Sequence, residues 1–381
     1  MNRLCFFATT SIGVEDVAAE EVRSLIGSDV KLEVGRVSFK GGVGDIYVLN
    51  LKARTLHKVY IQLVKADFKT LDDIYRVARS LDYTWIIDGD QSFAIRSERI
   101  GGHCFTSMDV SRVVGQAVID SYQEATGRRL RVDLEQPDVE IYCLVRNYSL
   151  LMGVNTTGES LHKRGYRVYD HPAALKPTIA AAMLKISGWR PGESLLDPMC
   201  GGATIPIEAA LMARGVMPSK FRSSFAFLKL KICDLQEFKA VRDKLLMEEN
   251  CSFNPEIYAM DKLQKHLSGG VKNAEEAGVK DAIKFKIGDA TKPEEYPNGF
   301  FSHIIVNPPY GLRAHPKEGV GRLYEEFLKA LKAKNPGSTL TIITAASKRF
   351  REAAEKTNIT IMERRKIMHG DLPAEIFTCK I

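Results

Sequence analysis

The sequence predicts an α/β protein in which a Rossmann-like sheet of seven strands, the last of them antiparallel, follows a mixed α+β region. Two observations predict this fold. After residue 172, near-continuous apolar runs alternate with helical patterns, as a parallel sheet covered on both faces requires. The last two runs are separated only by Gly370-Asp371-Leu372-Pro373, which leaves no room for a helix, so they form a hairpin and end the sheet antiparallel.

The N-terminal part shows strand and helix patterns without a regular alternation. A helix is expected over residues 11–26, where apolar residues recur at helical spacing, and another begins after the N-cap candidates Thr106 and Ser107. Asn147 marks a turn between two strands. The strand-like runs are 3–10, 30–39, 46–51, 140–145 and 150–154.

The C-terminal part contains the alternating strands and helices. Its strand-like runs are 194–197, 257–261, 283–287, 303–306, 340–344, 361–368 and 375–381. A polar and basic segment that ends in a proline separates this part from the first one. We therefore expect an N-terminal region of residues 1–155, a linker of residues 156–172 and a C-terminal domain of residues 173–381.

The composition is that of a well-packed chain with no export signal. At 381 residues it exceeds the usual size of one domain, and it has no apolar run long enough to span a bilayer. Seven cysteines include no CxxC pair, which argues against a disulfide framework and a zinc ribbon. We expect reduced thiols, a cytoplasmic location and no metal. The net charge of +7 lies in the second half and tolerates a nucleic-acid partner without requiring one.

Four consecutive predicted strands are followed by small or acidic residues, and ligands of open α/β sheets bind at such strand ends. The four endings are Asp197-Pro198-Met199-Cys200-Gly201-Gly202, Asp261, Gly288-Asp289-Ala290 and Asn307-Pro308-Pro309-Tyr310. Each one alone is explained by a turn or a helix cap. Their joint occurrence favours a cofactor site.

The cofactor expected at these strand ends is S-adenosylmethionine. The chain has no GxGxxG and no GxxxxGK[ST] motif, and Asp197 would repel a phosphate but attract an ammonium group. S-adenosylmethionine combines an adenosine with a cationic amino-acid tail. The expected cofactor-binding residues are Asp197, Pro198, Met199, Cys200, Gly201, Gly202, Thr204, Asp261, Asp289, Ala290 and Asn307.

The C-terminal half resembles the class I methyltransferases, with DPMCGGAT as motif I, YAMD as motif II, GDA as motif III and NPPYG as motif IV. Nearly the whole chain is similar to the THUMP-domain family of RNA guanine-N2 methyltransferases, whose N-terminal half is ferredoxin-like plus THUMP. The stretches that carry this likeness are TTSIGVE at 9–15, FAIR at 93–96, VDL at 132–134, PDV at 137–139, LHKRGYR at 161–167 and PAALKP at 172–177.

Within that family the chain is most similar to members that methylate guanosine 6 in the tRNA acceptor stem, because of its asparagine in motif IV and its single catalytic domain. Members that act on ribosomal RNA share the same motifs, so ribosomal RNA remains an alternative substrate.

Motif I departs from the family's usual Gly-Ser-Gly-Thr, since it reads Gly201-Gly202-Ala203-Thr204 here. The alanine methyl is tolerated at position 203 if φ is negative there, with Gly202 providing the conformational freedom.

The resemblance implies methylation of the N2 amine of guanine, a poor nucleophile because its lone pair is delocalised into the ring. The Asn307 side-chain oxygen and the Pro308 carbonyl are expected to accept its two hydrogens and to direct the lone pair toward the methyl donor. Tyr310 is expected to stack on a base flipped out of the stem. We expect no covalent role for Cys200, because amine methylation needs no enzyme nucleophile.

The expected partner is tRNA, held at its acceptor stem and 3′ end by shape and phosphates rather than by base sequence. Candidate contacts are the basic residues Arg128, Arg129, Lys163, Arg164 and Arg167. Arg128, Arg129, Lys163 and Arg164 would set the distance from the CCA end to the target. An insertion is expected around residues 216–234, and its phenylalanines at 221, 225 and 227 either face the RNA or pack against the sheet. No obligate protein partner is expected.

Two other functions fit parts of the sequence. DNA adenine-N6 and protein glutamine-N5 methyltransferases share the NPPY motif, but the THUMP resemblance disfavours them. A catalytically inactive RNA-binding protein is disfavoured because Asp197, Asp261, Asp289 and Asn307 are all intact.

Overall fold

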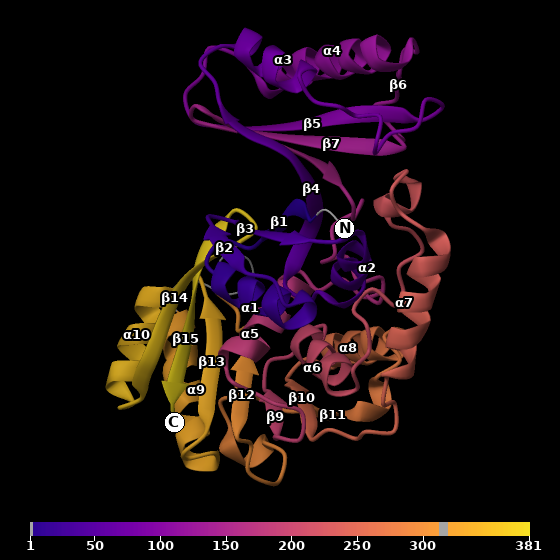
Figure 1. Ribbon diagram of the computed structural model, residues 1–381. Helices are drawn as coiled ribbons and strands as arrows, with labels where there is room; N and C mark the ends of the chain where they lie inside the picture. Colours follow the sequence, from indigo (N-terminus) through magenta and orange to yellow (C-terminus); the bar gives the residue numbers. More distant parts are fainter. Residues whose placement is uncertain (1–2, 312–318) are drawn as a thin grey trace.

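A computed structural model describes residues 3–311 and 319–381. Within these residues the chain forms an eight-stranded sheet from its N-terminal part and a seven-stranded sheet from its C-terminal part (Figure 1). No helix in the described ranges combines the length and apolar character needed to cross a bilayer.

The eight-stranded sheet is continuous through one long central strand. Its order is β2-β3-β1-β4-β8-β7-β5-β6, and β4 pairs antiparallel with both β1 and β8. The strands are β1 (Leu4–Thr10), β2 (Val30–Glu33), β3 (Arg36–Gly41), β4 (Leu56–Asp67), β5 (Ser92–Ile100), β6 (Arg131–Val132), β7 (Val139–Arg146) and β8 (Ser149–Asn155). Because one core runs along this sheet, the helices α1 (Glu15–Ile26), α2 (Val43–Lys52), α3 (Leu71–Arg79) and α4 (Ser107–Thr126) pack on it as one body.

The strand predicted over residues 46–51 is wrong, since this segment lies in helix α2. Gly42 is the N-cap, and its amide donates to the Asp45 carboxylate (2.8 Å), which stabilises the first turn. The apolar run is long because the helix is buried on two sides, against the sheet and against α7 (Leu235–Met247). A helix covered on two sides loses the amphipathic pattern that distinguishes it from a strand.

The seven-stranded sheet has the predicted strand number and the predicted antiparallel last strand. Its order is β11-β10-β9-β12-β13-β15-β14, and β15 runs antiparallel to both of its neighbours. The reversed strand therefore lies one position inside the edge, because the tight hairpin places β14 outside it. The strands are β9 (Leu195–Asp197), β10 (Ile257–Asp261), β11 (Ile283–Ile287), β12 (His303–Val306), β13 (Thr339–Thr344), β14 (Thr360–His369) and β15 (Leu372–Lys380).

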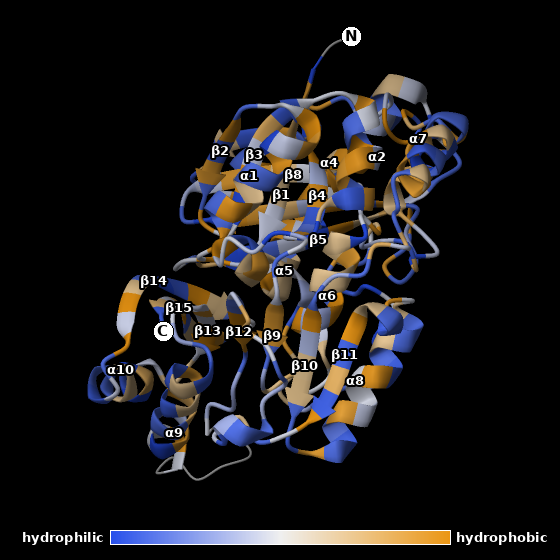
Figure 2. Ribbon diagram, turned by 90° about the horizontal axis from the view of Figure 1, so that it is seen from below, coloured by the Kyte–Doolittle hydropathy of each residue, from blue (hydrophilic) through white to orange (hydrophobic). Residues whose placement is uncertain are grey.

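Helices cover both faces of this sheet, as its apolar strands require. The helices α5 (Pro177–Ile186), α6 (Thr204–Ala213) and α8 (Gln264–Glu276) share one core, and α9 (Gly319–Lys334) and α10 (Ser347–Lys356) share the other. Figure 2 shows the central strands β9 and β12 as predominantly hydrophobic, whereas α8 and α9 carry hydrophilic residues as well.

The insertion between α6 and β10 joins the two halves of the chain. Phe225 and Phe227 are buried and stack at 5.0 Å between ring centroids, and Phe227 also lies 5.4 Å from Tyr47 of α2. Phe238 of α7 completes this aromatic cluster. The packing alternative is therefore correct for these two phenylalanines, although they pack on the N-terminal half instead of the neighbouring sheet. Phe221 remains 38% exposed.

Candidate active site

The four predicted strand ends meet in space. Strands β9, β10 and β12 are parallel neighbours, so the residues that follow them project from the same edge of the sheet. Two adjoining hollows lie there, and Asn307 lines both of them. Every residue expected to bind the cofactor lines one or the other: Asp197, Pro198, Met199, Cys200, Gly201, Gly202, Thr204, Asp261, Asp289, Ala290 and Asn307.

The motif I loop is positioned by Asp261. One carboxylate oxygen of Asp261 accepts the Gly201 amide (2.9 Å) and the other accepts the Leu263 amide (2.9 Å). The Cys200 amide donates to the Met260 carbonyl (2.9 Å), which ties the same loop to β10. Asp261 thus fixes the loop and lines the larger hollow, where its remaining lone pairs can accept ribose hydroxyls.

The negative φ that would let an alanine fit at position 203 without strain is not found. Ala203 has φ +58° and ψ 29°, in the left-handed region, whereas Gly201 and not Gly202 takes a positive φ. This conformation costs an alanine about 1 to 2 kcal/mol. The buried Ala203 methyl packs against Gly270 of α8, where an added Cβ would lie 2.9 Å from it. Packing therefore offsets part of the strain.

Asp197 is a buried carboxylate suited to a cationic ligand. It is 2% exposed, and burial raises the pKa of its carboxyl well above the usual range, with the nearby Asp261 acting in the same direction. The Met199 amide donates to it at 3.2 Å and favours the charged form. An ammonium group in the adjoining hollow would compensate this carboxylate, which is the fit expected for the tail of S-adenosylmethionine.

Cys200 and Asp289 differ in their electrostatic surroundings. Burial raises the pKa of the Cys200 thiol well above its usual value, so it is poorly suited to nucleophilic attack. At Asp289 burial acts to raise the pKa, but hydrogen bonds from the Thr291 amide (2.9 Å) and hydroxyl (2.8 Å) outweigh it and lower the pKa. Asp289 therefore caps a turn and lines the hollow at the same time.

The amide of Asn307 is held between two partners. Its Nδ2 donates to the Ala173 carbonyl (3.2 Å), and its Oδ1 accepts the Tyr310 hydroxyl. The Tyr324 hydroxyl donates to the Pro309 carbonyl (3.2 Å), which leaves the Pro308 carbonyl as the other acceptor of this turn. Burial raises the pKa of Tyr310, so its hydroxyl keeps its proton and acts as the donor.

A segment of residues 167–175 crosses the hollows, and its anchor was not recognised in the sequence. The buried Asn273 of α8 accepts the Val168 (3.0 Å) and Tyr169 (2.8 Å) amides, and it donates to the carbonyls of Tyr169 (3.1 Å) and Gly202 (3.0 Å). One side chain thus joins the linker to motif I. The signal available in the sequence is the Gly269-Gly270 pair inside a helix.

These two glycines allow close packing of the linker and motif I on α8. A Cβ on Gly269 would lie 2.2 Å from the Tyr169 ring, so only glycine fits there. The Tyr169 hydroxyl pairs with His266 Nδ1 (2.7 Å), and the His171 ring lies 4.4 Å from the His266 ring in an edge-to-face arrangement. Both histidines line the larger hollow.

The five predicted RNA contacts fall in different environments. Arg128 and Arg129 are exposed after α4, and Lys163 is exposed beside Glu159. The prediction for Arg164 is wrong, because its side chain is only 2% exposed and pairs with the fully buried Glu208 at 3.2 Å. A basic residue in a linker is indistinguishable by sequence from a buried ion-pair partner.

Arg167 is half-buried and serves the linker. Its guanidinium donates to the Leu175 carbonyl (2.7 Å) and to the Thr204 hydroxyl (3.2 Å). It therefore closes the segment that crosses the hollows and ties that segment to the start of α6.

Three family descriptions match this chain. Residues 164–375 match the RMKL-like methyltransferase domain, residues 68–155 match the THUMP domain, and residues 5–60 match the RlmL ferredoxin-like domain. Together they confirm the resemblance found in the sequence.

Curated relatives match over most of the chain. A tRNA (guanine(6)-N2)-methyltransferase of Archaeoglobus fulgidus is 44% identical over 99% of this chain and 92% of its own length. A protein of the same name from Methanocaldococcus jannaschii is 40% identical over 98% of both chains. A ribosomal RNA large subunit methyltransferase K/L of Aliivibrio salmonicida is 30% identical, but only 49% of its length is covered.

Solved structures share the architecture. A putative methyltransferase, SMU.472, in complex with SAH has a TM-score of 0.89 at 25% identity, covering 99% of this chain and 98% of that one. TrmN from Thermus thermophilus has a TM-score of 0.73 at 25% identity, covering 99% of both chains. The sequence motifs, the fold and these matches agree: the chain belongs to the RMKL-like methyltransferase family, among the members that carry a ferredoxin-like and a THUMP domain before the methyltransferase domain.

Proposed function

We propose that this protein transfers a methyl group from S-adenosylmethionine to the N2 amine of guanosine 6 in the acceptor stem of tRNA. The observation that carries the proposal is the position of the Asn307 amide, which lines both hollows beside Asp197, in a chain with a THUMP domain. The curated relatives named for this reaction support the choice of tRNA and of position six.

The residues present fit S-adenosylmethionine. Asp197 pairs with its ammonium group, Asp261 accepts its ribose hydroxyls, and the glycines of motif I let the backbone approach it closely. When bound, S-adenosylmethionine supplies an electrophilic methyl group on a positively charged sulfur.

The reaction depends mainly on positioning. Asn307 Oδ1 and the Pro308 carbonyl accept the two hydrogens of the guanine amine, which directs its lone pair to the methyl group, and near-attack geometry of this kind contributes several kcal/mol. Asn307 Oδ1 accepts the Tyr310 hydroxyl in the structure, so the incoming amine replaces Tyr310 as the partner of Asn307. The freed Tyr310 ring then stacks on the flipped base, a contact worth about 1 to 3 kcal/mol.

The N-terminal half recognises the acceptor stem and the 3′ end. We infer that residues 1–155 form the RNA-binding region and residues 173–381 the catalytic domain, with exposed Arg128, Arg129 and Lys163 contacting phosphates. A tRNA trimmed of its CCA end should be methylated more slowly than the intact one. Equal rates would contradict the idea that this region sets the distance to the target.

The deciding experiment measures labelled methyl transfer to unmodified tRNA and to ribosomal RNA, followed by nucleoside mass spectrometry and mapping. We expect N2-methylguanosine at position 6 of tRNA. Label in ribosomal RNA alone would show that this protein acts on ribosomal RNA, as the name of the K/L relatives indicates for them. Label in N6-methyladenosine or in protein would refute the proposal. No binding of S-adenosylmethionine by calorimetry would indicate an inactive RNA-binding protein.

Asn307→Ala tests the assigned role. It should retain cofactor binding and lose transfer by at least about a hundredfold, because the positioning effect is lost. Asn298→Ala is the matched control, since Asn298 is exposed and lies outside the hollows. Transfer by Asn307→Ala at a rate close to that of the control would refute the assignment.

A further inference from the structure

Four basic side chains from separate parts of the chain gather where the N-terminal half, the linker and the C-terminal sheet meet. We name His57, His162, Lys176 and His369 the junction cluster. His57 is the second residue of β4, His162 lies in the linker, Lys176 precedes α5 and His369 ends β14. All four are half-buried, and none of them belongs to the hollows described above.

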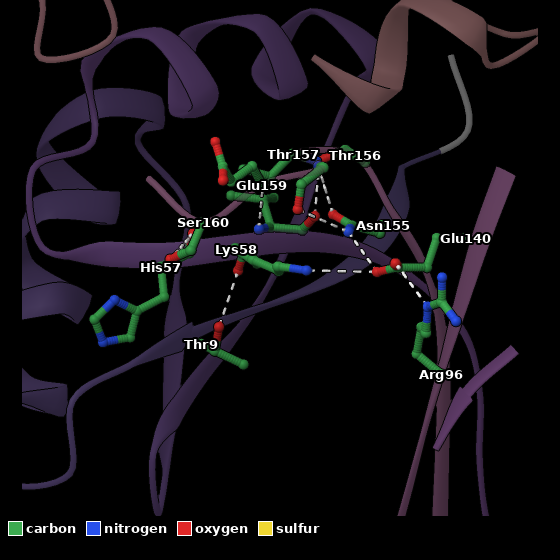
Figure 3. A network of polar contacts seen from close by, with 12 residues as sticks. Thr9, His57, Lys58, Arg96, Glu140, Asn155, Thr156, Thr157, Glu159 and Ser160 are labelled. Atoms are coloured by element: carbon green, nitrogen blue, oxygen red, sulfur yellow. Dashed lines mark hydrogen bonds and ion pairs between the residues drawn. The ribbon is translucent and has the colours of Figure 1, made fainter. Parts of the chain in front are cut away.

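Local contacts fix the two histidines nearest the linker. Their rings lie 5.9 Å apart in an edge-to-face arrangement. His57 Nε2 pairs with the Ser11 hydroxyl (3.1 Å), and His162 Nδ1 pairs with the Ser160 hydroxyl (2.7 Å). Figure 3 shows Ser160 beside His57, where its hydroxyl also donates to the His57 carbonyl oxygen (3.2 Å). The rings are thus held in place before any ligand binds.

The cluster is surrounded mainly by positively charged side chains. Burial is the largest cause that lowers the pKa of His57 to about 3 and the pKa of His162 to about 4; it is followed by His162 and then Lys176 for His57, and by Lys176 for His162. Burial and Lys176 also lower the pKa of His369. The Glu159 carboxylate interacts electrostatically with His162, but it already pairs with Lys163 (2.5 Å). His57 Nδ1 is buried without a hydrogen-bond partner among the described residues. A bound anion would offset the positive charge that these neighbours place on the cluster.

The cluster lies close to the Asn307 amide. Lys176 follows Ala173 by three residues, which span at most about 10 Å, and the Ala173 carbonyl accepts Asn307 Nδ2. His369 is hydrogen-bonded to the backbone of Ala174. A ligand bound at Lys176 is therefore within the reach of one or two nucleotides from a base at Asn307.

We propose that the junction cluster binds a phosphate group of the RNA backbone next to the target nucleotide; this inference rests on the function proposed above. An enzyme that flips a base has to hold the backbone beside it, and a lysine with neutral histidine donors is suited to a phosphate oxygen. The site would hold the strand after the N-terminal half has bound the acceptor stem.

The test compares Lys176→Met with Lys176→Arg and with Lys329→Met, an exposed lysine on α9 that pairs with Glu325. The affinity of each full-length protein for unmodified tRNA is measured over a range of salt concentrations. Lys176→Met should bind on the order of tenfold more weakly at low salt, and its plot of log affinity against log salt should be shallower by about 1. Lys176→Arg should restore both values, and Lys329→Met should match the wild type.

Separate outcomes distinguish this proposal from the proposed function. If the wild type methylates tRNA but Lys176→Met keeps the wild-type affinity and slope, the phosphate site is refuted and the function stands. If the slope falls for Lys176→Met while the wild type methylates no RNA, the phosphate site stands and the function fails. Calorimetry with inorganic phosphate completes the test, because a site that binds free phosphate without changing the tRNA slope would also refute the proposal.

Discussion

Asn273 is the residue whose replacement most sharply tests how the linker is attached to the cofactor loop. The perturbation is Asn273→Leu, which keeps a side chain of similar size and removes all four hydrogen bonds of the amide. It leaves two amides and two carbonyls of Val168, Tyr169 and Gly202 without their partner. At about 1 kcal/mol for each hydrogen bond, the decrease in the free energy of unfolding approaches 4 kcal/mol. Water reaches the exposed Val168 and replaces part of the lost hydrogen bonding. We therefore expect the free energy of unfolding of Asn273→Leu to fall by about 2 to 4 kcal/mol.

Asn335 provides a matched control for this replacement. It is also fully buried, but its side chain accepts only the Phe301 amide (2.9 Å), and its Nδ2 has no partner among the described residues. Asn335→Leu removes one hydrogen bond and also one unpaired donor. We therefore expect its free energy of unfolding to fall by about 1 kcal/mol or less.

The assay is urea unfolding of both variants, together with calorimetric titration of S-adenosylmethionine. Asn273→Leu should bind the cofactor more weakly, because Gly202 and the segment it anchors line the hollows, whereas Asn335→Leu should bind it normally. The reasoning is refuted if the two variants are equally stable, or if Asn273→Leu binds the cofactor as tightly as the wild type does.

Three further predictions concern single side chains. Tyr310→Phe should retain methyl transfer, whereas Tyr310→Ala should lower kcat/KM by about ten- to a hundredfold through the lost stacking; equal kinetics for both would refute the stacking role. Because burial raises the folded-state pKa of Asp197 above the usual 3.8, its contribution to stability is fully present below pH 3.8 and is lost as the pH rises through the folded-state value. At neutral pH Asp197→Asn should therefore raise the melting temperature of the ligand-free protein and abolish the additional rise caused by S-adenosylmethionine; a lower ligand-free melting temperature would contradict this. Glu208→Gln should destabilise the protein by about 3 to 5 kcal/mol in urea unfolding, because it leaves Arg164 buried without its counter-charge, and a loss below about 1 kcal/mol would be inconsistent with that pair.

The sheet and its ligand edge could be predicted because their signals are local. Short apolar runs, each followed by an acid, a glycine or NPPY, identify parallel strands and the edge at which they end. Asp197, Asp261 and Asn307 then meet because parallel neighbours bring their ends together. Helix α2 was mistaken for a strand for a related reason, since burial on two sides removes the periodicity on which the prediction depends.

Other features depend on partners that are distant in the sequence. The left-handed conformation of Ala203 is set by packing against Gly270, 67 positions later, and no local rule places an alanine there. Asn273 and Arg164 look like ordinary polar residues of a helix and a linker. Their roles follow only once α8 lies beside motif I and α6 lies beside the linker. Polar residues that join segments far apart in sequence therefore escape prediction from one sequence.

The proposed measurement of a distance from the 3′ end of tRNA requires that the two halves of the protein be held together firmly. Buried polar contacts at the junction of the two halves meet this requirement. Asn50 of α2 exchanges hydrogen bonds with Thr156 (3.1 Å) and Thr157 (2.6 Å), which fixes the start of the linker. The Phe227 amide of the insertion donates to the Thr156 carbonyl (2.8 Å). Arg54 of the N-terminal half donates to the Val216 carbonyl of the C-terminal half (2.5 Å).

Breaking these contacts would leave buried backbone and side-chain groups unpaired, so a hinge at this junction would cost several kcal/mol. Domains joined by a flexible linker move relative to one another by default, and such motion would blur any measured distance. The junction cluster lies on this fixed part of the chain, between the proposed RNA-binding region and Asn307. A phosphate bound at the cluster, as proposed, would therefore stay at a constant distance from both. Under that condition the enzyme can select the proposed target position by geometry instead of base sequence.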